Sequence, residues 1–149
     1  MKRLLTLTVV TLLCAVYAQA GDMKVDVKMA KDKDSEPTDT FAPDVRKIYA
    51  FFTTEGSTKG DKLRCVWIAE DVGDAADPNT TIDEASLTAD KDNFVGAFSL
   101  SKPTKGWPEG SYRVDFYSGD NVVTSVNFMI EKPEESEKSE KSKDESTGD

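Results

Sequence analysis

Three aspartates at a spacing of three residues are the side chains of this chain best suited to hold a ligand. They are Asp71, Asp74 and Asp77, in a segment rich in alanine and glycine that has the composition of a loop. Calcium takes six to eight oxygen ligands from carboxylates and carbonyls, and converging loops can supply them. These three residues are therefore the candidate calcium site. The interpretation we favour is an ordinary solvated loop whose aspartates serve its turns.

Enzymatic chemistry has little to build on, because the chain contains no histidine. Histidine is the usual general base, the usual partner of a serine or cysteine nucleophile, and the commonest transition-metal ligand. Ser99 and Lys102 match the Ser-x-x-Lys spacing of penicillin-binding enzymes, but they lie at the end of a strand pattern with Pro103 next. We predict a protein that is not an enzyme, with no catalytic residue and no cofactor apart from the candidate calcium ion.

The chain has two cysteines, Cys14 and Cys65. Cys14 lies in a leader segment whose removal we expect, so Cys65 would have no partner within the exported chain. Leu63 and Trp67 alternate with Cys65, which predicts an inward-facing and unreactive thiol. The alternative is a disulfide between two chains, which requires that strand to face outward.

The two ends of the chain differ from the segment between them. Residues 1–20 have a basic start, an apolar run too short to span a membrane, and the small-x-small ending Ala18-Gln19-Ala20. This pattern predicts a signal peptide, and therefore an exported protein, periplasmic or extracellular, with no membrane insertion after cleavage. Residues 131–149 contain no apolar side chain able to form a core, which predicts a disordered tail.

Cleavage after Ala20 would make the chain more acidic. It removes Lys2 and Arg3 but no acid, so the 19 basic residues become 17 against 28 acidic ones, for a formal charge of −11. Nucleic acids and anionic lipids are bound through basic patches. We therefore expect neither as a partner.

The body of the chain, residues 41–130, has the patterning of one all-β domain. No window keeps an apolar period near 3.6, whereas alternating runs recur between turn signals. The predicted strands cover residues 45–53, 62–70, 80–87 (at an edge), 93–100, 112–117 and 122–130. Residues 21–40 contain a further alternating run at 23–29 and then a charged linker. That run is either an edge strand or a mobile arm.

Alternation also predicts which side chains face the core. In the last strand the predicted inward row is Val122, Thr124, Val126, Phe128 and Ile130. Outward-facing aromatic side chains would offer a surface for a glycan or a peptide. The candidates are Tyr49, Phe51, Trp107 and Tyr117, although for Trp107 we favour a position that caps the end of the core.

The segment from Phe94 to Ile130 carries the motifs Gly106-Trp107-Pro108, Gly110-x-Tyr112-x-Val114 and Phe128-x-Ile130. It resembles the last three strands of immunoglobulin-like or fibronectin type III-like β-sandwich modules of exported bacterial proteins. The resemblance implies a single antiparallel β-sandwich of about seven strands. It also implies that Tyr112 forms a tyrosine corner and that Trp67 is the buried tryptophan of the third strand.

From these observations we interpret the chain as an exported, monomeric, non-enzymatic module that binds a protein or glycan partner. An open sheet edge is the expected means of binding, because its unpaired backbone groups accept an added strand. The alternative is a calcium-dependent adhesion or matrix domain that uses the loop at residues 71–77. The sequence does not name the partner.

Overall fold

The computed structural model describes residues 22–133, so the predicted signal peptide and most of the predicted tail lie outside the described residues. Within this range the chain forms eight strands, one short 3-10 turn (η1, Gly73–Ala75) and no helix long and apolar enough to cross a membrane. The strands are β1 (Lys24–Ala30), β2 (Thr40–Phe41), β3 (Lys47–Glu55), β4 (Lys62–Asp71), β5 (Thr80–Thr88), β6 (Val95–Ser101), β7 (Gly110–Ser118) and β8 (Asn121–Ile130). The predicted all-β class is confirmed, with one strand more than expected.

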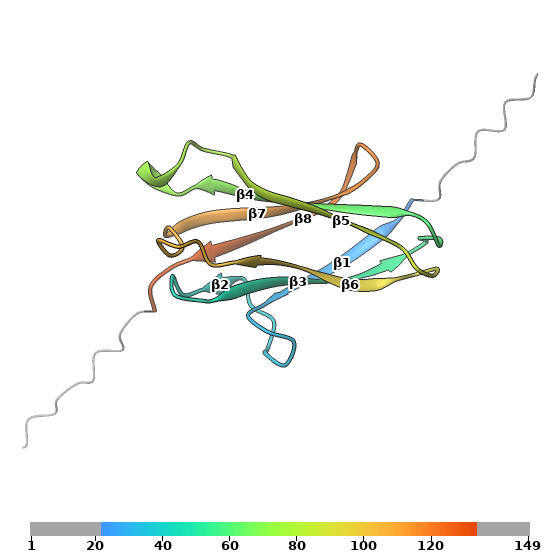
Figure 1. Cartoon of the computed structure of the whole chain (residues 1–149), viewed down its shortest axis with the longest axis horizontal. Helices are drawn as coiled ribbons and strands as arrows, with labels where there is room; N and C mark the ends of the chain where they lie inside the picture. The colour runs from blue at the N-terminus through green and yellow to red at the C-terminus, as the bar shows by residue number, and fades with distance from the viewer. Residues whose placement is uncertain (1–21, 134–149) are drawn as a thin grey trace, which may run out of the picture.

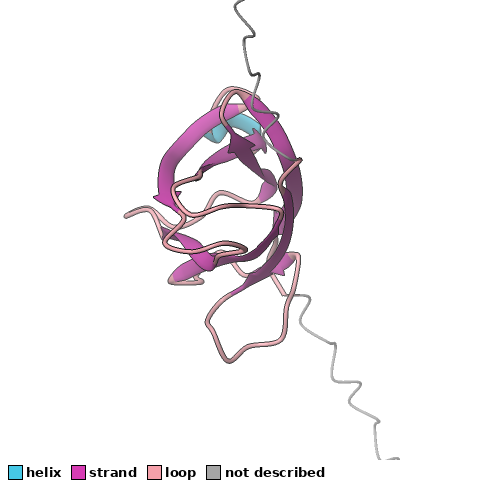
Figure 2. Ribbon diagram, turned by 90° about the vertical axis from the view of Figure 1, so that its right-hand side faces the viewer, coloured by secondary structure: helices cyan, strands magenta, loops and turns pink. Residues whose placement is uncertain are grey.

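The strands form two sheets that pack face to face (Figures 1 and 2). One sheet has the order β1-β3-β6 and the other the order β2-β8-β7-β4-β5. Every pairing is antiparallel except that of β2 with β8. With β3 and β6 as strands B and E, and β4, β7 and β8 as strands C, F and G, this is the strand order of an immunoglobulin-like sandwich.

The run at residues 23–29 is a strand in the sheet and not a free arm. β1 pairs antiparallel with β3 along its whole length, from Lys24 opposite Glu55 to Ala30 opposite Tyr49. It forms one edge of the three-stranded sheet, so the edge-strand interpretation is the right one.

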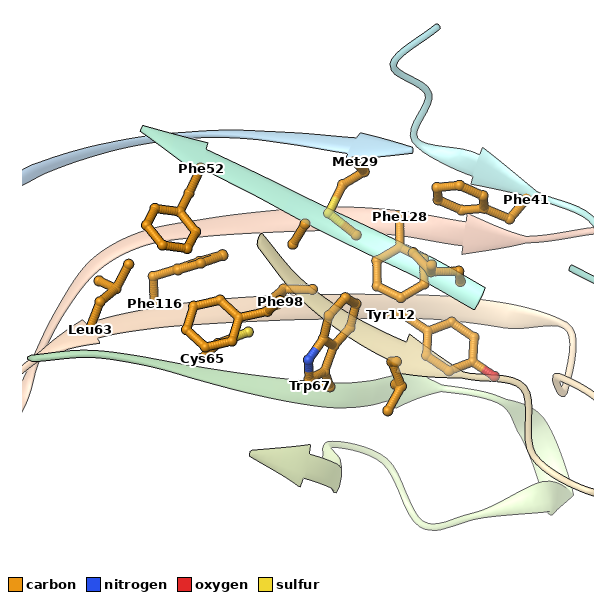
Figure 3. Packing of buried hydrophobic residues seen from close by; sticks show 14 of the residues in the cluster. Met29, Phe41, Phe52, Leu63, Cys65, Trp67, Phe98, Tyr112, Phe116 and Phe128 are labelled. Atoms are coloured by element: carbon orange, nitrogen blue, oxygen red, sulfur yellow. The ribbon is translucent and has the colours of Figure 1, made fainter. Parts of the chain in front are cut away.

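Alternating side chains of the two sheets meet in one aromatic core (Figure 3). Trp67, Phe98, Tyr112 and Phe128 are all buried, as the alternation predicts. Tyr112 stacks on Phe128 at 5.2 Å between ring centroids, and Trp67 meets Phe128 edge to face at 6.1 Å. Offset and edge-to-face pairs of this kind add stability beyond the burial of their surface.

The start of β8 departs from the predicted alternation. Phe116 pairs with Thr124 but Tyr117 pairs with Val122, which leaves Val123 as the extra residue of a β-bulge. As a result Val123 packs against the core and Val122 is 52% exposed. The prediction that Val122 faces inward is therefore wrong, because a strict period of two does not anticipate an inserted residue.

The two sheets differ in width, since five strands face three. The wider sheet ends in β2 on one side and in β5 on the other, and β5 pairs with β4 and makes few contacts with any other element. All nine of its residues are exposed. Figure 1 shows β5 beside β4 along the upper sheet of the sandwich. The prediction of an edge strand at residues 80–87 is confirmed.

Candidate functional site

β5 is the strand of the described chain best placed to bind another molecule. One side of its backbone pairs with β4 and the other side has no neighbouring strand. Two large apolar side chains of this strand, Ile82 and Leu87, are each 38% exposed. Unpaired edges with apolar side chains are where a partner strand adds to a sheet.

A β-bulge shapes the first half of this edge. Asp83 pairs with Trp67 and Thr81 pairs with Ile68, so Ile82 is the extra residue in the ladder between β4 and β5. Bulges bend and twist an edge strand locally and redirect its side chains. The bulge therefore interrupts the regular edge at Ile82 and gives this side chain its own direction.

An apolar groove of about 560 Å³ lies beside the start of β5. Its walls come from η1 and its flanking residues, from β5 and from the loop between β6 and β7. The apolar residues that line it include Val72, Ala76, Ile82, Pro103, Trp107 and Pro108. Small-molecule sites occupy roughly 300–1,000 Å³, so the groove has room for a large side chain.

The tyrosine corner forms the floor of this groove. The Tyr112 hydroxyl donates a hydrogen bond of 2.6 Å to the carbonyl oxygen of Pro108, four residues upstream. Burial raises the pKa of Tyr112 to about 12, because the ionised phenol loses its hydration. The tyrosine corner predicted for this position is confirmed.

Trp107 is buried and caps the end of the core, as expected from its place between glycine and proline. Its indole Nε1 donates a hydrogen bond of 2.8 Å to the carbonyl oxygen of Val45, and its ring meets that of Tyr112 edge to face at 6.1 Å. These contacts tie the loop between β6 and β7 to the segment before β3. Trp107, which forms one wall of the groove, is consequently held by contacts to both sheets: to the segment before β3 and to Tyr112 of β7.

Gly110 brings the opposite wall close. It has a φ of +146°, and a Cβ atom there would collide with the carbonyl oxygen of Asp71. Only glycine allows this approach of β7 to the end of β4. The approach holds the acidic segment that follows Asp71 against the groove.

The structure spreads the three aspartates of the acidic segment. Asp71 ends β4, Asp74 lies in η1 and Asp77 lies in the loop that follows, all exposed. Asp71 Oδ1 accepts a hydrogen bond of 3.1 Å from the backbone N–H of Gly73. Among residues 22–133, no group of three or more cysteine, aspartate or glutamate side chains is placed to hold a metal. The calcium site remains a prediction that gains no support from this arrangement.

The four candidate surface aromatics do not form one face. Tyr49 and Phe51 lie on the outer side of the three-stranded sheet, Tyr117 lies on β7 in the other sheet, and Trp107 is buried. Tyr49 stacks on Phe51 at 5.4 Å, and the guanidinium of Arg64 lies 4.2 Å from the ring centroid of Tyr117. These rings already contact side chains of the protein, which disfavours a platform on which a sugar ring stacks.

The outer face of the five-stranded sheet carries a polar network that sequence reasoning missed. Asp115 is buried at 6% exposure and accepts hydrogen bonds from Arg113 Nε at 2.9 Å and Ser125 Oγ at 2.6 Å. Arg113 also donates to Glu70, a bond that raises the pKa of the guanidinium. The partners come from three strands, so no local pattern reveals them. Among the described residues no buried side-chain polar atom lacks a hydrogen-bond partner, which indicates that this network is a structural one.

Cys65 has the inert position predicted for it. The side chain is fully buried between the sheets and forms no disulfide within the described residues. Burial, followed by the charges of Asp83 and Asp115, raises the pKa of the thiol far above its usual range. A thiol that stays protonated and inaccessible is a poor nucleophile and a poor partner for a second chain.

No protein-family model matches this chain, and no curated protein matches it. Among solved structures it is similar to an immunoglobulin-like protein from Pseudomonas aeruginosa at 15% identity and a TM-score of 0.45, over 74% of this chain and 93% of that one. It is also similar to part of an alkylpurine DNA glycosylase from Pseudomonas fluorescens, at 14% identity and a TM-score of 0.46, over 73% of this chain and 30% of that one.

A third similar structure is a β-glucosidase from Kluyveromyces marxianus, at 12% identity and a TM-score of 0.42. The likeness covers 74% of this chain but 14% of the β-glucosidase. Likenesses this distant bring no activity to the chain. The architecture rests on the strand order described above.

Proposed function

We propose that this protein is an exported, non-enzymatic β-sandwich module that binds an extended segment of a partner protein along β5. The observation that carries the proposal is the overhang of β5, whose nine residues are all exposed beyond the narrower sheet. In β-strand addition the backbone supplies hydrogen bonds and pockets for alternate side chains supply selectivity. Export rests on the pattern of residues 1–20 and places the protein in the periplasm or outside the cell.

A protein partner fits the molecule better than a glycan. The rings of Tyr49 and Phe51 are half-buried and stack on each other, and Lys47 Nζ lies 5.8 Å from the centroid of the Tyr49 ring. β5, by contrast, offers a free backbone edge with apolar side chains. An edge of that kind recognises extended polypeptide.

The edge is also protected against unselective pairing. Asp83 and Glu84 lie in the middle of β5, next to the bulge at Ile82. Charged residues and bulges are the devices by which natural edge strands avoid aggregation. Two copies of β5 would bring acidic side chains together, which supports a monomer that accepts a different chain.

Hydrogen exchange tests the proposal directly. The full chain, expressed with its own first twenty residues, would be used to select peptides from a displayed random library. We expect a selected peptide to slow exchange at alternate amides of β5, because only every second residue of an antiparallel strand bonds to a given neighbour. Slowed exchange at β1, the edge at the far side of the other sheet, or at neither edge would contradict the proposal.

The same peptide can be modified to test strand addition without changing the protein. Methylation of the backbone nitrogens at alternate residues removes the donors that would face β5, and we expect it to abolish binding. Methylation of the other set leaves those donors in place and should preserve binding. Equal effects of the two sets would show that no strand is added.

A calcium titration separates the alternative function. If the segment at residues 71–77 binds calcium, millimolar calcium should raise the melting temperature of the full chain, since a ligand stabilises the state that binds it. An unchanged melting temperature would speak against the calcium-dependent adhesion domain.

A further inference from the structure

Resting on the proposed function, we infer that the groove beside β5 receives one large apolar side chain of the added strand, and that lysine or arginine residues flank that side chain. The occupant is thus a basic, extended protein segment with a bulky apolar anchor. The position of the groove, its lining and the charge around it carry the inference.

The groove and the strand edge share residues. Thr80 and Ile82 belong to β5 and also line the groove. A strand added to β5 would therefore run along the groove, and its side chains would alternate toward the groove and away from it. One of the side chains on the groove side meets the apolar lining beside Ile82.

The groove lies at the Ile82 end of β5. At the other end the Leu87 side chain reaches across to β6, where a Cβ atom on Gly96 would lie 3.5 Å from Leu87 Cδ1. The Leu87 side chain therefore lies close to β6 at that end. The anchor of the partner is thereby assigned to the Ile82 end, which fixes the register of the added strand.

The charge around the groove defines the residues that flank the anchor. Asp74, Asp77 and Asp83 lie in the segments that form its walls or border them, all exposed, and none has an ion-pair partner among residues 22–133. Glu84, by contrast, pairs with Arg64 at 3.3 Å. Lys105 is the one charged residue in the lining itself. An extended segment bearing cations would complement this rim and associate faster at low salt.

The probes are four seven-residue peptides with blocked ends. In the first, four lysines alternate with valine, tryptophan and valine, so that tryptophan is central and the apolar residues share one face. The second has serine in place of tryptophan, and the third has glutamate in place of each lysine. The fourth has the composition of the first with its lysines in one block, which keeps the charge and removes the alternation.

We expect the first peptide to bind the full chain and to protect β5 amides, with the serine peptide about tenfold weaker because the anchor is lost. The glutamate and block peptides should not protect β5. Ile82→Ser should weaken the tryptophan peptide about tenfold and the serine peptide less than twofold. The matched control is Val122→Ser, which removes an exposed apolar side chain from β8, outside the groove.

The outcomes distinguish this inference from the proposed function. Equal affinity of the tryptophan and serine peptides, with β5 still protected, would overturn the groove as an anchor site and leave strand addition intact. Absence of β5 protection with every peptide, including those selected from the library, would overturn both. Binding of free indole in the groove without β5 protection by any peptide would assign the groove to small molecules and also overturn the inference.

Discussion

β4 and β5 are neighbours in one sheet, yet six of the ten residues of β4 are buried and all nine residues of β5 are exposed. Leu63 of β4 and Leu87 of β5 lie directly opposite each other in the ladder. Leu63 is 0% exposed and Leu87 is 38% exposed. The same residue type on adjacent strands thus has two different roles, because β4 faces the three-stranded sheet and β5 extends past it.

The largest expected effect tests this pair. Leu63→Ala should lower the free energy of unfolding by about 2–5 kcal/mol, because it leaves a cavity in a close-packed core. Leu87→Ala should cost less, about 1 kcal/mol, since Leu87 is 38% exposed and its loss leaves no closed cavity. Urea denaturation of both variants measures the difference. Similar losses would show that β5 is packed as tightly as β4.

Alkaline pH should also act on the core and not on β5. The pKa of Tyr112 is raised from 10.0 to about 12 in the folded state, so the folded chain holds this proton more tightly than the unfolded chain does. The resulting stability is complete below about pH 10 and is lost as the pH rises toward 12, by about 1.4 kcal/mol per pH unit at most. Burial raises the pKa of Cys65 from 9.0, so its contribution begins to fall from about pH 9.

Single variants separate the two groups. Cys65→Ala should remove the part of the decline that starts near pH 9, and Tyr112→Phe the part that starts near pH 10. The measurement is the free energy of unfolding between pH 8 and pH 12. A decline of the same shape in both variants and in the unchanged protein would mean that other groups cause it.

The tyrosine corner should have a moderate effect at neutral pH. Tyr112→Phe removes the 2.6 Å bond to Pro108 and should cost about 1 kcal/mol. Tyr117→Phe is the matched control, because Tyr117 lies on the same strand but on the outer face of its sheet. Thermal unfolding of both variants provides the comparison. Equal stability of the two variants would mean that the hydrogen bond of the Tyr112 hydroxyl does not stabilise the fold.

Most of the fold is predictable because its core strands follow a period of two. Phe98, Tyr112 and Phe128 are buried as alternation predicts, and the turn residues around Trp107 mark the corner correctly. Alternation fails at Val122 because a bulge inserts one residue, and it does not decide whether β1 pairs because that depends on a contact with a distant strand. Neither an inserted residue nor a distant pairing has a local signal.

The site was predicted less fully than the fold. The sequence indicated an edge strand at residues 80–87, but it did not show that this strand overhangs the opposite sheet, which depends on the two strand counts. The charges of the acidic segment make it a candidate for calcium, whereas the structure shows that its apolar residues Val72 and Ala76 line the groove. The loop after β4 brings Val72 and Ala76 next to the turn that contains Trp107, which is distant in the sequence. The spacing of residues along the chain does not predict a contact of this kind.

The smallest change in stability is expected from removing the two charges of β5, and this variant tests most directly how the exposed strand β5 differs from β4. Asp83→Thr combined with Glu84→Thr removes the charges of β5 and should change the free energy of unfolding by about 1 kcal/mol or less, because the Glu84–Arg64 pair is exposed. The variant should nevertheless self-associate, since an uncharged edge pairs with its copies. Asp120→Thr combined with Glu131→Thr removes the same number of negative charges at exposed sites outside β5 and should stay monomeric. Sedimentation of both variants decides the matter: a monomeric β5 variant would mean that the bulge at Ile82 alone protects the edge.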